Sequence, residues 1–230
     1  MRAQDLPEVR ALSLFADMAE ASFGSLVRGA YVQTFPPSIE LITEGDPADF
    51  FHVVLSGAVE LVGAWRDRET TITTVQPLGT FILAATIKDR PYLMTARTLE
   101  KTRIALIPSE DVRAVFSEDH AFARAVVTEL AAGYRVKVKT IKNLKLRTGI
   151  ERLAAYLLRA RGDGPASFEL ELEKRRLASL LGMTPENLSR AFGGLKAYGV
   201  KVDGSTITLG DEKALRGLAR PTPLIDDLDH

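Results

Sequence analysis

Residues 174–192 read KRRLASLLGMTPENLSRAF, and this stretch decides the fold of the C-terminal part of the chain. The leucine spacing over 177–181 predicts a short helix with one apolar face. Gly182 predicts a tight turn directly after that helix, because glycine tolerates backbone angles that other residues avoid. Thr184 followed by Pro185 is typical of a helix start, where threonine caps the first amides and proline needs no amide partner. The stretch therefore predicts two short helices joined by a turn.

The second predicted helix carries three polar side chains on one face. Glu186, Ser189 and Arg190 lie at positions i, i+3 and i+4, whereas Leu188 and Phe192 can point inward. An arginine can donate two hydrogen bonds to a guanine, and a glutamate can accept one from a cytosine amino group. The pattern favours a recognition helix over the alternative, a helical hairpin with a solvated polar face. The candidate DNA-binding residues are Lys174, Arg175, Thr184, Glu186, Asn187, Ser189 and Arg190.

A β-hairpin is expected after the two helices. Residues 202–209 place β-branched side chains on either side of an Asp203-Gly204 turn. Before the two helices, residues 150–160 show apolar side chains at helical spacing, and residues 168–172 alternate like a strand. Together these elements predict a winged helix-turn-helix.

Composition limits the classes of function. The chain has 230 residues, 46% of them hydrophobic, which suffices for two domains with real cores. The absence of cysteine excludes disulfides, thiolate zinc sites and cysteine-held iron–sulfur clusters, and we predict no metal site. There is no apolar run of about 18 residues and no charged-then-apolar leader, so we expect a cytoplasmic protein without a membrane span. Scattered histidines, without a serine-centred elbow or a phosphate-binding glycine loop, argue against an enzyme.

Basic residues concentrate in the C-terminal half although the whole chain has a net charge of zero. Residues 146–220 contain 13 Lys and Arg against 9 Asp and Glu. Residues 135–147 contain no acidic residue and could neutralise DNA phosphates, while a solvated helix face is the alternative. The basic residues of this run are Arg135, Lys137, Lys139, Lys142, Lys145 and Arg147.

The N-terminal half has a different pattern, in which short β-rich segments are separated by Gly, Pro and Asp. Many short strands at close spacing predict a rolled or barrel-like sheet, and residues 12–29 are expected to form a helix against it. The predicted strands are residues 39–43, 51–55, 58–62, 70–75 and 103–108.

A long helix is predicted between the two halves. Residues 119–148 carry apolar side chains at alternating steps of three and four, which is a heptad pattern that Lys137 interrupts. The pattern fits a dimer seam, and an amphipathic helix lying on its own core is the alternative. A two-fold dimer would place two recognition helices about 34 Å apart for a palindromic site. The candidate dimer residues are Val127, Leu130, Tyr134, Val138 and Ile141.

This order of parts resembles the CRP/FNR superfamily of bacterial transcription regulators over roughly residues 12–209. The resemblance rests on residues 42–46, 51–57 and 59–61 in the first half and, more specifically, on residues 177–190. It implies an α+β protein with a β-roll like a cyclic-nucleotide-binding jelly roll, a long dimerisation helix and a winged helix-turn-helix. The expected divisions are 1–116 for the sensor roll, 117–148 for the dimerisation helix, 149–217 for the DNA-binding domain and 218–230 for a tail.

The recognition helix is similar to that of FNR-type members. A Glu followed by a Ser-Arg pair implies a TTG-N8-CAA palindrome, whereas Pro185 stands where cyclic-AMP-type members carry an Arg. The resemblance thus implies double-stranded DNA and a second copy of the chain as partners, with RNA polymerase as a further candidate. We expect the tail to be a loose extension, and a partner contact is the alternative.

The effector is expected to differ from a cyclic nucleotide. Family members that bind one hold its phosphate with a Gly-Glu turn and an Arg-Ser or Arg-Thr pair, which residues 78–86 and the Tyr92-Leu93 pair lack. Arg90 or Arg97 could substitute, so a cyclic nucleotide stays an alternative, as does regulation without an effector. A small apolar ligand fits the apolar composition, and the pattern resembles the family's nitric-oxide-responsive, denitrification-type members, which implies a haem. The axial-ligand candidates are His52, His120 and Met94, with a packed structural histidine as the alternative. The expected effector-pocket residues are His52, Phe81, Tyr92 and Met94.

Overall fold

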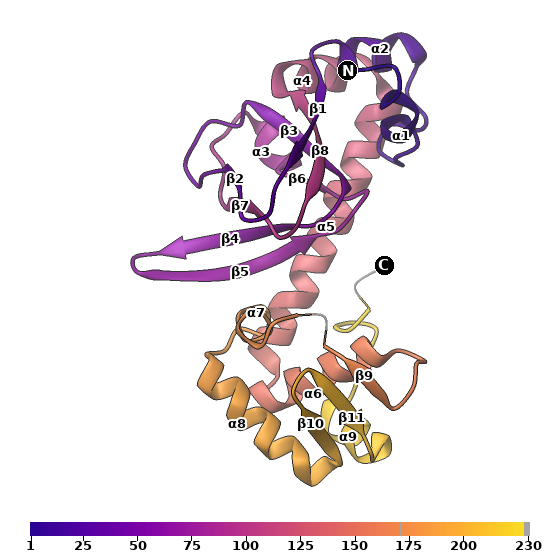
Figure 1. Cartoon of the computed structure of the whole chain (residues 1–230). Helices are drawn as coiled ribbons and strands as arrows, with labels where there is room; N and C mark the ends of the chain where they lie inside the picture. The colour runs from indigo at the N-terminus through magenta and orange to yellow at the C-terminus, as the bar shows by residue number, and fades with distance from the viewer. Residues whose placement is uncertain (171, 228–230) are drawn as a thin grey trace. The chain divides into compact units, whose positions relative to one another are not determined.

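The chain folds into two compact units, Met1–Ala131 and Ala132–His230, in a computed structural model that describes residues 1–170 and 172–227 (Figure 1). Helix α5 (His120–Leu146) is continuous through the boundary between the units, which agrees with the long helix predicted from the heptad pattern. No helix among the described residues is long and apolar enough to cross a membrane.

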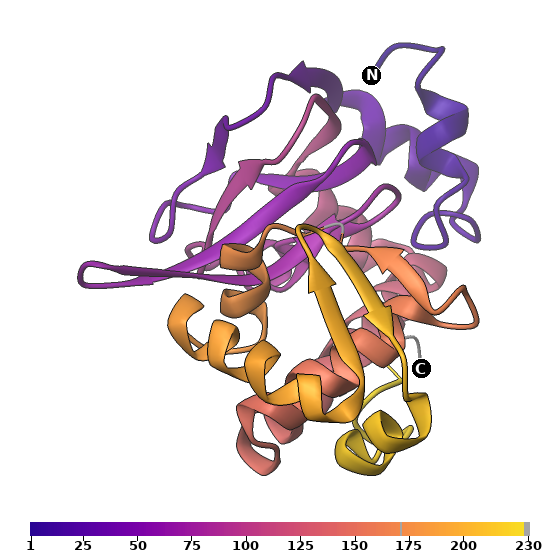
Figure 2. The same ribbon diagram turned by 60° about the horizontal axis from the view of Figure 1, so that its bottom comes forward.

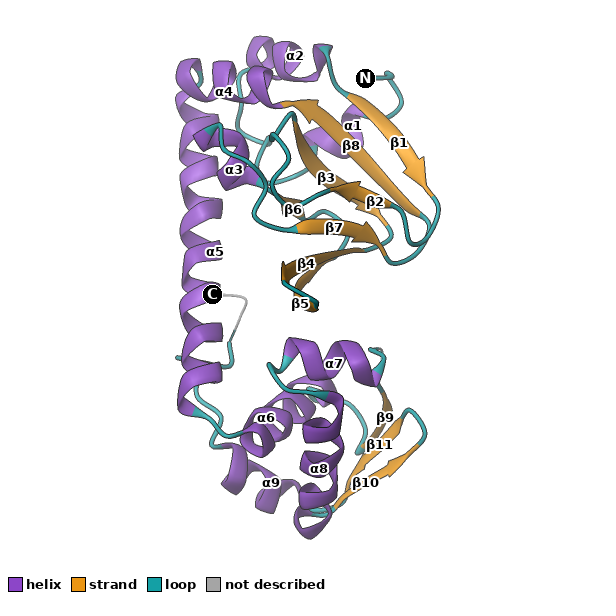
Figure 3. Cartoon of the chain, turned by 90° about the vertical axis from the view of Figure 1, so that its left-hand side faces the viewer, coloured by secondary structure: helices purple, strands orange, loops and turns teal. Residues whose placement is uncertain are grey.

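The first unit is built on two antiparallel four-stranded sheets, as the predicted β-roll requires (Figure 3). One sheet has the order β1-β8-β3-β6 and the other has the order β2-β7-β4-β5. The sequence patterns missed strands β1, β6 and β7. The strands are β1 (Tyr31–Phe35), β2 (Glu40–Ile42), β3 (Phe50–Ser56), β4 (Val59–Trp65), β5 (Arg68–Val75), β6 (Thr80–Phe81), β7 (Thr95–Thr98) and β8 (Thr102–Pro108).

Strand β3 supplies side chains to two cores because successive residues point to opposite faces of a sheet. Phe51, Val53 and Leu55 are buried in the core that the helices share. Val54 belongs to the second core, between the sheets, and His52 is stacked on an aromatic ring of that core. The hairpin of β4 and β5 ends in Trp65, whose side chain is 73% exposed.

Four further helices complete the first unit, and one of them corrects an expectation. Residues 12–29 do not form one helix, because residues 12–19 form turns whose apolar side chains fill the core. Regular helix begins only at Glu20, where Asp119 accepts a hydrogen bond from the Ala19 amide at 3.0 Å. The helices are α1 (Leu6–Arg10), α2 (Glu20–Arg28), α3 (Leu83–Lys88) and α4 (Ser109–Glu118).

The second unit is the predicted winged helix-turn-helix (Figure 2). A capping box of Thr148 and Glu151 starts its first helix, and the hairpin of β10 and β11 is the expected wing, extended by β9. Of the strand predicted at 168–172, residue 171 lies outside the described residues. The elements are α6 (Gly149–Arg161), β9 (Ser167–Glu169), α7 (Lys174–Leu180), α8 (Pro185–Leu195), the 3-10 helix η1 (Lys196–Tyr198), β10 (Val200–Asp203), β11 (Thr206–Leu209) and α9 (Glu212–Ala219).

The tail expected to be loose is folded instead. Within the described part of the tail, Asp226 pairs with Arg147 at the end of α5, and Thr222 accepts two backbone hydrogen bonds in a tight turn. The expectation failed because the partner of Asp226 lies 79 residues earlier in the chain. The division into 1–116, 117–148, 149–217 and 218–230 stays a prediction.

Candidate nucleic-acid interface and sensor core

The turn between α7 and α8 requires glycine. Gly182 has a φ of +62°, and a Cβ atom placed there would lie 2.6 Å from Cδ2 of Leu144. A Cβ atom there would force the end of the Leu144 side chain to move, and the left-handed backbone disfavours any side chain at this position, so glycine suits the turn beside the end of α5. The turn thereby fixes where α8 begins.

Arg152 of α6 ties the same turn to the end of α5. Its guanidinium donates to the Leu181 carbonyl at 2.8 Å and to the Arg147 carbonyl at 2.7 Å, with a longer bond of 3.3 Å to the Leu144 carbonyl. These carbonyls follow helix ends, where backbone acceptors have no partner within the helix. Sequence reasoning missed Arg152, because an isolated arginine in a helix carries no pattern.

Helix α8 starts as its sequence predicts. The Thr184 hydroxyl accepts a hydrogen bond from the Asn187 amide at 3.2 Å, and Pro185 occupies the first turn. A hydrogen bond to Thr184, the backbone amide of Glu186 itself and the charge of Arg190 hold the pKa of the Glu186 carboxyl below its ordinary value. Glu186 is therefore an ionised acceptor at neutral pH.

The outer face of α8 presents the polar side chains singled out from the sequence. Glu186, Ser189 and Arg190 are exposed, whereas Leu188 and Phe192 are only 2% and 8% exposed. An Arg190 nitrogen donates to the Asn187 side-chain oxygen, so both groups lie on the same exposed side. The face holds a carboxylate, a hydroxyl and a guanidinium next to one another.

Three further exposed cations lie on neighbouring elements of this unit. Lys174 and Arg175 open α7 and are exposed. Lys201, in the first wing strand, is also exposed, and the sequence analysis did not name it. The available signal was its position between Val200 and Val202, directly before the predicted hairpin.

Three of the six basic residues between positions 135 and 147 are engaged by the folded tail. Lys139 is 7% exposed and donates to the Asp227 carbonyl, Lys142 donates to the Leu224 carbonyl at 3.2 Å, and Arg147 pairs with Asp226. The expectation that the whole run faces DNA phosphates is wrong for these three residues. Their carbonyl and carboxylate partners come from the folded tail, which sequence patterns did not reveal. The exposed members are Arg135, Lys137 and Lys145.

The candidate dimer residues of α5, here called the α5 stripe, form an apolar row. Val127, Tyr134 and Ile141 are large hydrophobic residues, yet they are 59%, 71% and 52% exposed. Val138 is 38% exposed, and Leu130 is half-buried against the core of the first unit. A row of this kind on one side of a helix is typical of a surface that meets a partner.

The expected effector residues, here called the sensor core, are packed on one another. The His52 ring stacks on Phe81 with centroids 4.8 Å apart, and Tyr92 meets it edge-on at 6.4 Å. His52, Phe81 and Tyr92 are at most 4% exposed, and Met94 is half-buried against the same core. Because His52 is only 2% exposed, its ring nitrogens are not open to a haem iron, so these residues as packed do not fit that group. His120 is exposed at the first residue of α5.

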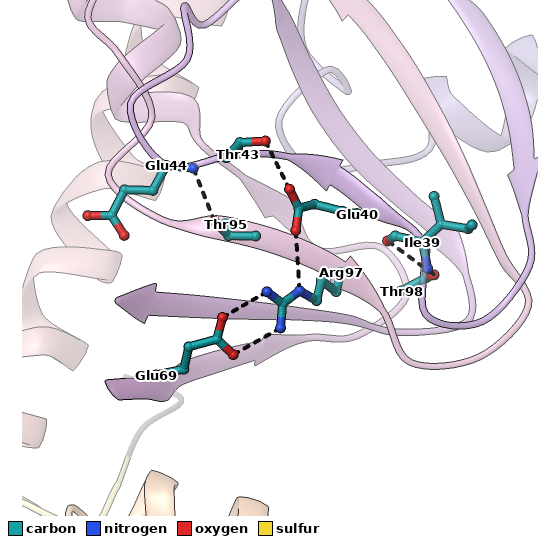
Figure 4. Close-up of polar contacts among 8 residues, drawn as sticks. All are labelled: Ile39, Glu40, Thr43, Glu44, Glu69, Thr95, Arg97 and Thr98. Atoms are coloured by element: carbon teal, nitrogen blue, oxygen red, sulfur yellow. Dashed lines mark hydrogen bonds and ion pairs between the residues drawn. The ribbon is translucent and has the colours of Figure 1, made fainter. Parts of the chain in front are cut away.

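Tyr92 and Arg97, which the sequence analysis considered for phosphate binding, are both engaged by other groups of the first unit. Tyr92 is buried, and its hydroxyl donates to the Phe50 carbonyl at 3.3 Å. Arg97 donates to both carboxylate oxygens of Glu69, at 2.9 and 3.1 Å, and to Glu40 at 3.5 Å (Figure 4). Its hydrogen-bonding capacity is thus directed to two carboxylates.

Comparisons with known proteins agree on the class of both units. The family described as "Cyclic nucleotide-binding domain" matches residues 32–119, and the "Crp-like helix-turn-helix domain" matches residues 151–218. The chain is 25% identical to an "Anaerobic regulatory protein" of Pasteurella multocida over 189 residues, 79% of this chain and 69% of the relative. It is 20% identical to the "CRP-like cAMP-activated global transcriptional regulator" of Mycobacterium tuberculosis, covering 90% of this chain and 96% of the relative.

The fold is similar to that of a solved structure. FixK2 from Bradyrhizobium japonicum matches with a TM-score of 0.68 and 22% identity, covering 84% of this chain and 98% of that one.

Burial makes His52 a source of acid sensitivity. Desolvation lowers the pKa of His52 from 6.5 to about 4, although a hydrogen bond with the Phe50 backbone acts in the opposite direction. The unfolded chain therefore binds a proton at His52 at a higher pH than the folded chain does. We expect His52 to lower the free energy of unfolding by about 3 kcal/mol as pH falls from 6.5 to 4, and to have no such effect above that window.

Denaturant unfolding of the wild type and of His52→Phe across pH 4 to 7 measures this contribution. The variant is expected to lack this loss of stability at low pH, because phenylalanine has no ring nitrogen to protonate. Parallel pH profiles of the two proteins would show that His52 is not buried as described.

Proposed function

Because the chain belongs to the CRP/FNR superfamily of transcription regulators, we propose that it reads a TTG-N8-CAA palindrome as a homodimer under the control of an effector other than a cyclic nucleotide. Its relatives are regulators, so its activity is regulated binding rather than catalysis. We place it in the cytoplasm with the DNA that it binds, and RNA polymerase is a further candidate partner.

The exposed face of α8 carries the proposal. A major-groove contact needs a bidentate donor for guanine and an acceptor for the cytosine amino group, and Arg190 and Glu186 offer them one turn apart. Ser189 lies between them and is small enough for close approach to the base edges. The fixed α7–α8 turn and the cap at Thr184 support this reading, because base contacts require a recognition helix with a defined start.

The homodimer is supported by the α5 stripe. Exposed apolar side chains at heptad spacing along one helix are most readily covered by the same stripe of a second copy, packed about a two-fold axis. Two recognition helices related in this way match the two halves of a palindrome.

Two observations support an effector other than a cyclic nucleotide. Arg97 is held by Glu69 and Glu40, and Tyr92 is buried at the place of the family's phosphate-binding pair. Of the effectors expected from the sequence, a small apolar ligand is the candidate that we favour. Effector-independent binding is the alternative, and the closed packing of the sensor core also fits it.

Removal of the Arg190 guanidinium tests base reading. Arg190→Ala is expected to weaken binding to a TTG-N8-CAA duplex by about 30-fold or more, because a homodimer loses two bidentate base contacts, each worth about 1 to 3 kcal/mol. Fluorescence anisotropy on this duplex and on a scrambled duplex measures both affinities. Lys213→Ala, which removes an exposed charge of α9, is the matched control. An equal loss on both duplexes would mean that Arg190 binds phosphate and reads no base.

Charges placed in the α5 stripe test the dimer. Tyr134→Glu and Ile141→Glu are each expected to yield a monomer in sedimentation velocity and to weaken operator binding about tenfold or more, since two half-sites are then bound independently. Thr128→Glu adds the same charge beside the stripe and is expected to leave the dimer intact. If the stripe variants stay dimeric, with unchanged circular dichroism, the dimer uses another surface.

Titration with cyclic AMP or cyclic GMP tests the effector class. Either nucleotide at millimolar concentration is expected to change the operator Kd by less than about twofold, because Tyr92 replaces the family's phosphate-binding arginine and Arg97 is engaged by two carboxylates. Isothermal titration calorimetry provides a direct measure of nucleotide binding in the same buffer. An increase in operator affinity of about fivefold or more, within the usual range of allosteric coupling, would restore the cyclic nucleotide as the effector.

A further inference from the structure

The end of helix α5 and the folded tail meet at one arginine. Arg147 lies in the two-residue junction between α5 and α6, and its side chain is only 8% exposed. It forms a bidentate pair with Asp226, with nitrogen–oxygen distances of 2.5 and 2.8 Å, and donates to the Arg220 carbonyl at 3.2 Å. Bidentate pairing of this kind fixes direction as well as distance.

The tail is ordered around the same carboxylate. Asp226 also accepts a hydrogen bond from the Thr222 amide at 2.7 Å, while the Thr222 carbonyl accepts from the Ile225 and Asp226 amides at 3.0 and 2.8 Å. Lys142 and Lys139 of α5 hold the backbone of this turn through the Leu224 and Asp227 carbonyls. The segment is therefore attached to α5 by side chains spread over more than two helical turns.

Arg152 holds the same junction from its other side. It donates to the carbonyls of Leu144 and Arg147 and, in the turn before α8, to the carbonyl of Leu181. Two arginines thus fix the last turn of α5, one through the tail and one through the helix-turn-helix.

From this arrangement we propose that residues 220–227 form a latch that sets the angle between α5 and the winged helix-turn-helix, with Arg147 and Asp226 as positioning residues for DNA binding. The inference rests on the proposed function, because the angle matters only if α8 must meet DNA at a defined place. The junction between α5 and α6 has only two residues. A change in its backbone therefore turns the whole winged helix-turn-helix, and α8 with it. Neither residue of the pair is needed to touch DNA.

A competing role of the tail predicts that its removal strengthens DNA binding instead of weakening it. The tail occupies Lys139, Lys142 and Arg147, and a tail that merely masked these cations would inhibit binding to phosphates. Burial of the arginine in a bidentate pair favours the latch, since a mask needs only a weak, exposed contact.

The test measures operator affinity against salt concentration for the full-length wild type, Asp226→Asn, and a chain ending at Pro221. Both variants are expected to bind the TTG-N8-CAA duplex about tenfold or more weakly, with an unchanged slope of log K against log salt, because no phosphate contact is lost. Asp163→Asn makes the same chemical change in an exposed loop and is expected to bind like the wild type. A double variant, Arg147→Asp with Asp226→Arg, is expected to recover part of the loss.

Hydrogen exchange of the amides at 144–149 provides a readout without DNA. Exchange there is expected to accelerate in Asp226→Asn while the circular dichroism and the exchange of the α6 core stay unchanged.

Wild-type affinity together with wild-type exchange in both variants would overturn the latch. Tighter binding with a steeper salt slope would overturn it in favour of a mask. If the wild type itself does not bind the duplex, the proposed function fails, and the exchange experiment alone decides about the latch.

Discussion

The close approach of Gly182 to Leu144 is the constraint on which the rest of the second unit depends. The left-handed backbone at Gly182 lets the turn lie against the Leu144 side chain, and the Leu181 carbonyl beside it accepts a hydrogen bond from Arg152. The start of α8 follows directly after this turn, and Arg152 ties the turn to the α5–α6 junction. If base reading depends on the direction of α8, the turn from which α8 starts has to be rigid.

Those parts of the fold that depend on local patterns could be predicted from the sequence. The helix-turn-helix, the wing and the long helix are each defined by spacing, caps and turn residues within a few positions. The turns at residues 12–19 and the folded tail were not predictable in this way. Asp119 acts on Ala19 across 100 residues and Arg147 on Asp226 across 79, and a linear pattern does not contain such pairs.

The candidate sites show a second limit of sequence reasoning, which concerns whether a charged group is already engaged. Arg97 and Arg147 both look like free cations in the sequence, yet each meets a carboxylate from a distant segment. The predicted residues of the sensor core do lie together, but they fill their own space. Composition reveals that a charge or a ring is present, whereas only the contacts reveal whether it has capacity left for a ligand.

The hairpin of β4 and β5 gives the protein a built-in optical probe. Trp65 is the only tryptophan in the sequence, and its side chain is 73% exposed at the end of that hairpin. Its fluorescence therefore reports the solvent around one hairpin tip and is nearly blind to the melting of the three hydrophobic cores. A blue shift of this emission on mixing with another macromolecule would locate the contact at the tip without any label.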